Sequence, residues 1–166
     1  MTPLVGASKL SIYLNDHLAG ATVGVEVARR AARNNEGGPY GPSLAELASE
    51  IAADRKALLM VMQQLSIGAD TLKVAISWLS EKATRLKLNG ELLHYSDLSR
   101  LEELELLALG VRGKLAMWDA LVLTHAEDPR LEETDLEAAR SRARSQLRRL
   151  ERMRQRSVVE ALQASE

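Results

Sequence analysis

The chain is predicted to be an all-α protein with a single domain, residues 1–166. Three observations predict this. Apolar residues recur at steps of three and four over long segments, which is the period of an amphipathic helix. No segment alternates with the period of a strand. The length of 166 residues suits one domain, and such a domain buries roughly two thirds of the surface that its unfolded chain exposes. We expect five helices.

The first helix is expected from about residue 10 to residue 33, and the Gly-rich run 36–39 ends it. A second stripe on this helix carries His17, Gly20 and Gly24. Two glycines four apart cost about 1 kcal/mol each in helix propensity, so they permit a close helix crossing or leave room for a larger side chain opposite. The apolar seam is Leu14, Leu18, Ala21, Val25, Ala28 and Ala32.

The second helix is expected to start at the capping box formed by Ser43 and Glu46 and to continue to about Ser66. A shorter third helix follows, from about residue 70 to the Asn-Gly turn at 89–90. The seams are Leu44, Leu47, Ile51, Asp54, Leu58, Val61 and Leu65 in the second helix, and Leu72, Ile76, Leu79, Ala83 and Leu86 in the third.

The fourth helix is expected to begin near Asp97 or Ser99 and to end before the Asp-Pro pair at 128–129. A capping box of Thr134 with Glu137 opens the fifth helix. Four long helices with a short one between the second and the fourth predict an up-down-down-up bundle with a crossover helix, which is how ferritin-like bundles are connected. The seams are Leu101, Leu104, Ala108, Val111, Leu115, Trp118 and Val122 in the fourth helix, and Leu136, Ala143, Leu147 and Leu150 in the fifth.

Charge is balanced overall but segregated along the chain. The net charge of −1 gives no general attraction to nucleic acid. Residues 91–137 hold twelve acidic against four basic side chains, a balance of −8, and residues 140–156 hold eight Arg against one Glu, a balance of +7. The arginines are spread around their helix with no aromatic residue among them to stack on bases. We therefore expect them to pair with the acidic helix beside them, and nucleic-acid binding is not expected.

Compartment and membrane association follow from the composition. The chain has no cysteine, which excludes disulfides, thiol nucleophiles and cysteine-ligated zinc. No apolar run reaches the roughly eighteen residues of a membrane span. Residues 1–8 lack the basic start and apolar stretch of a signal peptide. A cytoplasmic location without membrane association is expected.

Asp54 is the one charged residue in a core seam. A carboxylate buried alone costs several kcal/mol, so Asp54 is expected near the rim or paired with His17, Lys82 or Arg85. A structural polar contact that sets helix register is one interpretation. A functional pocket around His17, Gly20, Gly24 and Asp54 is the other.

Metal binding was considered because ferritin-like di-metal sites use a Glu from each of two helices and a Glu-x-x-His from each of the other two. The only such motif, Glu91 to His94, is expected in a connection between helices. A metal site holding iron or manganese would therefore depend on four other side chains: His17, Glu26, Glu50 and Asp54.

Three segments carry a resemblance to known proteins: 13–30 (YLNDHLAGATVGVEVARR), 81–90 (EKATRLKLNG) and 101–114 (LEELELLALGVRGK). They resemble an uncharacterised bacterial family of ferritin-like helical bundles, and the resemblance spans most of the chain. It implies a ferritin-like fold, with di-iron chemistry where the ligands match. Glu26 and Glu50 are then the equivalents of the bundle carboxylates, while the lack of a mid-helix Glu-x-x-His departs from the pattern.

The function expected from these patterns is that of a non-catalytic module, acting as a homo-oligomer or with a protein partner. Complete seams, an incomplete ligand set and a charge-segregated last helix favour it. Under this interpretation no cofactor is bound. The alternative is a ferritin-like metalloprotein with an incomplete or unusual carboxylate and histidine site. No Ser, His and acid set indicates a hydrolase, and an enzyme is not the favoured interpretation.

Overall fold

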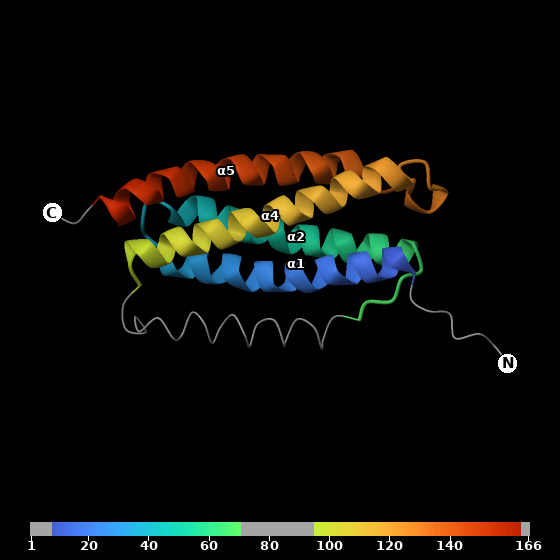
Figure 1. Ribbon diagram of the computed structural model, residues 1–166, viewed down its shortest axis with the longest axis horizontal. Coiled ribbons are helices and arrows are strands. Elements are labelled where there is room, and N and C mark those ends of the chain that lie inside the picture. The colour runs from blue at the N-terminus through green and yellow to red at the C-terminus, as the bar shows by residue number, and fades with distance from the viewer. Residues whose placement is uncertain (1–7, 71–94, 164–166) are drawn as a thin grey trace.

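The computed structural model describes residues 8–70 and 95–163. In these ranges the chain forms the helices α1 (Lys9–Asn34), α2 (Gly41–Gln64), α4 (Asp97–His125) and α5 (Leu136–Leu162) and the 3-10 turn η1 (Pro129–Leu131) (Figure 1). None of these residues lies in a strand, so the all-α prediction is confirmed. The predicted third helix, apart from its first residue, and the Glu91 to His94 motif lie outside the described residues.

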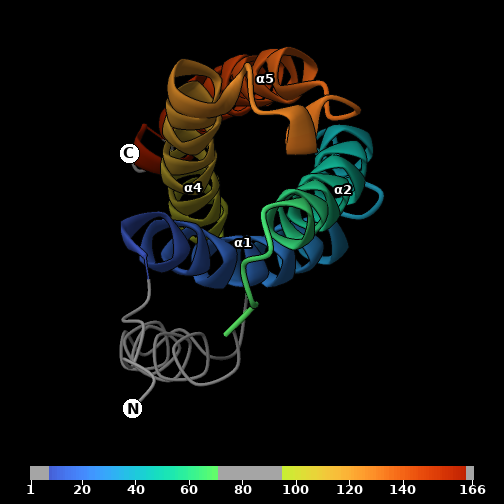
Figure 2. The same cartoon turned by 90° about the vertical axis from the view of Figure 1, so that its right-hand side faces the viewer.

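The helices pack as two antiparallel pairs, α1 with α2 and α4 with α5, and α2 and α4 run in the same direction (Figure 1). Seen along the bundle, α1 lies beside both α2 and α4, and α5 closes the fourth side (Figure 2). The backbones of α2 and α5 approach each other less closely, and long polar side chains span the distance between them. No helix in the described part of the chain is long and apolar enough to cross a membrane.

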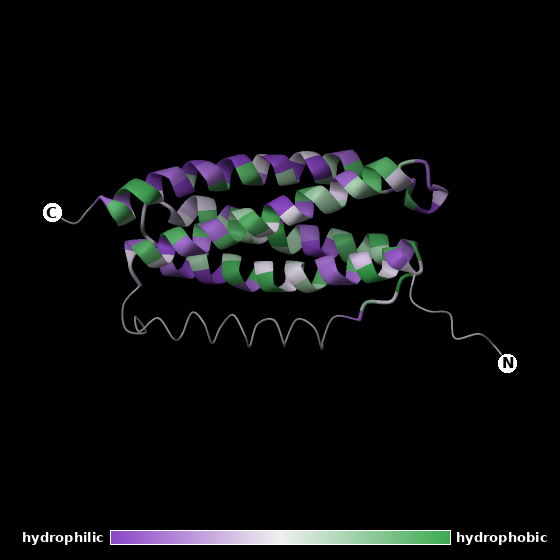
Figure 3. Cartoon of the chain, in the orientation of Figure 1, coloured by the Kyte–Doolittle hydropathy of each residue, from purple (hydrophilic) through white to green (hydrophobic). Residues whose placement is uncertain are grey.

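Buried apolar side chains form two clusters, one toward each end of the bundle. The seam predicted on α2 is buried at all seven positions, including Asp54. The fully buried Trp118 of α4 belongs to one cluster and Leu150 of α5 to the other. Figure 3 shows that α5 is hydrophilic along most of its length, in agreement with its Arg-rich sequence.

A second buried carboxylate fixes the start of α4 beside the end of α1. Glu103 is only 7% exposed and accepts hydrogen bonds from Arg30 Nε at 2.7 Å and from the Tyr95 hydroxyl at 2.9 Å. Asn35 Nδ2 donates to the same Tyr95 oxygen at 2.8 Å. Burial raises the pKa of Tyr95, so its hydroxyl keeps the proton that it donates to Glu103.

The predicted capping box of α2 is wrong. The helix begins earlier, at Gly41, and its N-cap residue Tyr40 makes no side-chain capping bond, so Ser43 is already inside the first turn. Two features place the start here. Pro42 fits the first turn because no N–H is needed there. A Cβ on Gly41 would lie 2.6 Å from the Asn35 carbonyl oxygen, so only glycine permits this close approach.

The capping box predicted for α5 is also wrong. Asp135 is the N-cap residue, and its carboxylate accepts a hydrogen bond from the Ala138 backbone N–H at 2.8 Å. The Thr134 hydroxyl instead donates to Gln64 Oε1 of α2 at 2.7 Å. A side chain engaged by a neighbouring helix is not free to cap its own, and the next residue takes that role.

Candidate functional site

Asp54 lies at the centre of a buried polar network. Lys114 Nζ donates to Asp54 Oδ2 at 2.7 Å, and Gln146 Nε2 donates to the same oxygen at 2.9 Å. Arg142 Nε donates to Oδ1 at 3.2 Å. Lys114 also donates to Gln146 Oε1, which closes a triangle between α2, α4 and α5. Every partner is a donor, as an ionised carboxylate requires.

The network continues along α2 toward its start. Gln146 Nε2 also donates to Glu50 Oε2 at 3.0 Å, and Arg149 pairs with both Glu50 and Glu46. The α2 acids are spaced by four, so they form one row facing the polar side chains of α5. The polar network around Asp54 lies between the two apolar clusters along the bundle, so a layer of polar side chains separates them.

The partners proposed for Asp54 from the sequence are not those observed. His17 makes no ion pair with it, and Lys82 and Arg85 lie outside the described residues. The prediction that Asp54 needs a partner if buried holds: its side chain is 1% exposed and that of Lys114 is 14% exposed. Desolvation lowers the pKa of Lys114, and the Asp54 charge opposes this shift.

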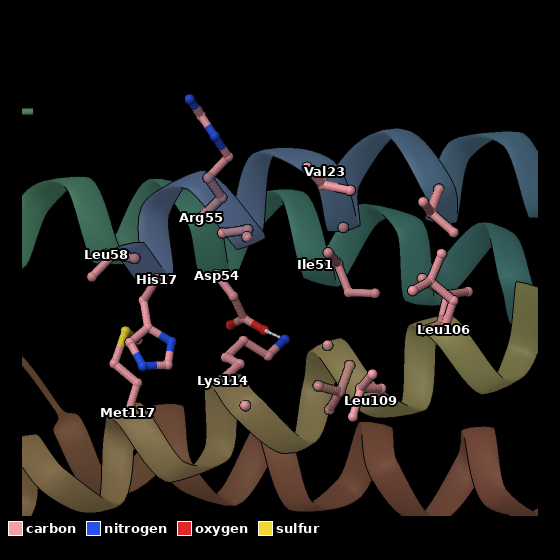
Figure 4. Close-up of a pocket in the computed structure, with 18 of the residues that line it drawn as sticks. His17, Val23, Ile51, Asp54, Arg55, Leu58, Leu106, Leu109, Lys114 and Met117 are labelled. Carbon is pink, nitrogen blue, oxygen red and sulfur yellow. Dashed lines mark hydrogen bonds and ion pairs between the residues drawn. The ribbon is translucent and has the colours of Figure 1, made fainter. Parts of the chain in front are cut away.

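A cavity of about 230 Å³ lies beside this network, between α1, α2 and α4 (Figure 4). Most of its lining surface is apolar, and the polar residues of the lining are Asp16, His17, Asp54, Arg55 and Lys114. The cavity reaches the surface between α1 and α4, where Gly20, Leu109 and Gly110 are exposed. Asp54 and Lys114 also line the cavity, where they form an ion pair with each other. The pocket residues predicted from the sequence, His17, Gly20, Gly24 and Asp54, all belong to the lining.

The glycines of α1 and α4 at the cavity do not serve close helix packing. A Cβ built at Gly20, Gly24, Gly110 or Gly113 meets no described atom within 4 Å. The sequence suggested a close helix crossing or a larger side chain opposite the α1 glycines, and among the described residues neither is found. Gly110 and Gly113 of α4 likewise make no close contact with the described part of α1. All four positions line the cavity.

His17 supplies an imidazole at one end of the cavity, next to Met117 of α4 (Figure 4). Its ring contacts the Tyr13 ring edge-on, at 4.6 Å between centroids. No side chain or backbone group of the described residues forms a hydrogen bond with it. Desolvation lowers its pKa, and the nearby Asp16 charge opposes this, so the ring is neutral at pH 7 and has one N–H donor and one acceptor.

The four candidate metal ligands do not form one site. Glu26 is half exposed and pairs with Arg29, one turn along the same helix. Glu50 and Asp54 face α5, while His17 faces the cavity from α1. Among the described residues no three His, Cys, Asp or Glu side chains stand close enough to hold a metal ion.

The sequence analysis did not predict the partly buried Lys114 or the buried Gln146 and Glu103 as members of polar networks. Lys114 and Gln146 flank seam positions, one residue before Leu115 and Leu147 respectively. A flanking residue points inward or outward according to the rotation of its helix, and the periodicity does not fix that rotation. One signal was available: a buried Asp54 needs a cation, and Lys114 is the only lysine on the fourth predicted helix.

The arrangement favours binding over chemistry. At the cavity Asp54 and Lys114 neutralise each other, and Arg55 Nε donates to the Thr22 hydroxyl at 2.9 Å. The uncharged His17 offers a hydrogen bond inside a largely apolar surface. Comparison of the chain with known protein families, with curated proteins and with solved structures finds no match.

Proposed function

We propose that this chain is a non-catalytic helical bundle that acts by binding, and that the cavity holds a small, largely apolar molecule. The observation that carries the proposal is that four helical glycines surround a cavity that no side chain of residues 8–70 and 95–163 fills. Alanine at each position would be favoured by up to about 1 kcal/mol, and no described atom obstructs its Cβ. A bundle selected only for stability gains nothing from these glycines, whereas a binding site gains room.

The size and lining of the cavity define the kind of ligand. An engineered apolar cavity of about 150 Å³ is large enough to hold benzene, and this one measures about 230 Å³. Two acidic residues, Asp16 and Asp54, and two basic residues, Arg55 and Lys114, line the cavity, so the formal charge of its wall sums to zero, and Asp54 and Lys114 are paired with each other. The ligand is therefore uncharged over most of its surface.

The test is to fill the cavity without unfolding the protein. Gly24→Leu places a side chain into open space and improves helix propensity, so the variant is expected to be at least as stable as the parent. Ala116→Leu adds similar bulk on an exposed face of α4, outside the cavity, and is the matched control. Melting temperatures of all three proteins are measured with cyclic, branched and unbranched alcohols and hydrocarbons.

A ligand at a hundred times its Kd stabilises by about 2.7 kcal/mol, which raises the Tm by roughly 5–10 °C for a chain of this length. We expect such a rise for the parent and Ala116→Leu and none for Gly24→Leu. If no compound raises the Tm of the parent, or if Gly24→Leu responds equally, the cavity is not a binding site.

The ferritin-like assignment and the bacterial family are further proposals. The order of the helices and the antiparallel pairing of α1 with α2 and of α4 with α5 support the first of these proposals. A cytoplasmic location is likewise a prediction.

The metalloprotein alternative stays a prediction for His17, Glu26, Glu50 and Asp54. Three basic or amide partners occupy the Asp54 carboxylate, so a metal would have to displace Lys114, Arg142 or Gln146. Elemental analysis of protein purified without chelators tests it. Stoichiometric iron or manganese supports the alternative, and less than about a tenth of a metal per chain excludes it.

Self-association is the second mode of binding that we propose. Leu123 and Leu109 of α4 are 83% and 64% exposed, and large exposed apolar side chains favour contact with a partner. Light scattering after gel filtration measures the mass directly. A dimer or larger oligomer supports the proposal, and a strict monomer over a wide concentration range contradicts it.

A further inference from the structure

The cavity is elongated along the bundle. Its lining on α1 extends from Asp16 to Val27, and its lining on α4 from Leu106 to Met117. At a rise of about 1.5 Å per residue, each stretch is about 16 Å long. His17 and Met117 lie at one end, and Leu106 lies at the other (Figure 4). The space is therefore a slot parallel to α1 and α4.

The walls of the slot suit a flexible aliphatic chain. Apart from the His17 imidazole, no lining residue is aromatic, so the slot has no platform on which a flat ring would stack. Valine, isoleucine, leucine and methionine side chains form the walls, and the glycines of α1 and α4 leave space along the length. Lys114 turns its ammonium toward Asp54 and Gln146, away from the open space.

The polar end of the slot is the neutral His17, whose ring nitrogens have no hydrogen-bond partner among the described residues. Such a group offers one donor and one acceptor, which a hydroxyl matches with its own acceptor and donor. The Asp16 carboxylate lies close enough to His17 to influence its pKa, and it would repel an anionic head group.

We propose that the slot binds an unbranched aliphatic alcohol of about ten to twelve carbons, with its hydroxyl at His17 and its chain extending toward Leu106. This proposal rests on the proposed function. The length follows because a C–C bond of about 1.52 Å advances an extended chain by about 1.3 Å, so about 16 Å accommodates about twelve carbons.

The experiment is a titration, by calorimetry, with unbranched alcohols from about six to about fourteen carbons. Each added methylene is expected to tighten binding about fourfold, the equivalent of about 0.8 kcal/mol per buried CH₂, and the gain stops near twelve carbons. The carboxylate of the same length is expected to bind at least tenfold more weakly at pH 7.

His17→Leu tests the head group separately from the chain. We expect it to weaken the alcohol about fivefold and to leave the matching alkane unchanged, whereas His17→Gln, which keeps a donor and an acceptor, retains most of the alcohol affinity. A purely structural role for His17 would weaken both ligands together. Equal effects on alcohol and alkane therefore overturn the assignment of His17.

The outcomes also separate the two proposals. Cyclic or branched compounds that bind as tightly as unbranched ones, or an affinity without any length limit, would overturn the unbranched-chain proposal and leave the cavity as a binding site. Tighter binding of the carboxylate than of the alcohol of the same length would overturn the proposal of an uncharged head group. If nothing binds and Gly24→Leu behaves like the parent, the proposed function fails as well.

Discussion

Replacing Asp54 by Asn tests whether the polar layer holds the two halves of the core together. The substitution keeps the size of the side chain but removes the charge opposite Lys114. The two side chains are 1% and 14% exposed, so the ammonium stays largely buried without its ion-pair partner, and only the charge of Glu50 still favours it. Breaking such a pair costs about 3–5 kcal/mol. Because a buried lysine can also lose its proton, we expect the lower end, about 3 kcal/mol.

The loss is measured as the free energy of unfolding in urea and as a decrease in Tm of roughly 6–12 °C. The matched control is Glu46→Gln, which removes the exposed end of the same network, where Glu46 pairs with Arg149 and is 65% exposed. An exposed pair contributes about 0–1 kcal/mol, so this variant is expected to stay near the parent.

The pH dependence gives a second signature of the same variant. The pKa of Lys114 in the folded parent is already below its ordinary 10.5, and without the Asp54 charge it falls further. Between this lowered pKa and 10.5 the unfolded chain binds more protons than the folded one, so over that pH range the stability of Asp54→Asn rises with pH. The gap to the parent narrows as the pH increases.

Two results would refute this reasoning. One is a loss below about 1 kcal/mol for Asp54→Asn, and the other is an equal loss for Glu46→Gln. A double substitution, Asp54→Leu with Lys114→Met, is expected to regain much of the stability, because an apolar pair of similar volume replaces a buried ion pair at little cost.

Three further predictions concern single positions. Gly110→Ala is expected to raise the unfolding free energy by about 0.4–1 kcal/mol in urea, since no described atom obstructs its Cβ; a loss would show that the space is filled. The lowered pKa of His17 means that the unfolded chain binds more protons than the folded one, so stability decreases as the pH falls below about 6.5. Free energies of unfolding in urea at several pH values should decrease less steeply for His17→Leu than for the parent, and equal slopes against pH would contradict this prediction. Asp135→Ala should lower the free energy of unfolding by about 1 kcal/mol because it removes the N-cap of α5, whereas Glu137→Gln should change it by less than about 0.5 kcal/mol. A larger loss for Glu137→Gln than for Asp135→Ala in urea unfolding would support the capping box of Thr134 with Glu137 instead.

The candidate site was accessible to sequence analysis only in part. His17, Gly20, Gly24 and Asp54 were grouped into one pocket because helical spacing places the first three on one stripe of α1 and Asp54 on the seam of α2. The structure brings these four residues to one cavity. The contribution of α4, which includes Gly110 and Gly113, was not predicted. Spacing shows which residues share a face but not how far away the facing helix lies.

Helix boundaries show the same division. The starts of α1 and α4 agree with the sequence within two residues, since Ser8 and Ser96 cap them through local hydrogen bonds. The N-cap of α2 is Tyr40 rather than Ser43, three residues earlier than predicted, because Gly41 approaches the Asn35 carbonyl. The N-cap of α5 is Asp135 rather than Thr134, one residue later, because Thr134 is engaged by Gln64. Local caps are readable from the sequence, while capping groups used in tertiary contacts are not.

The sequence by itself determined that this protein is helical, where most of its helices lie and that the seam of α2 carries one acid needing a partner. These properties depend on local propensity and on a period of about 3.6 residues. Only the tertiary structure decided that Lys114 and Gln146 are the partners of Asp54 and that the glycines surround a cavity. Both depend on the rotation and separation of packed helices, which many distant contacts determine together.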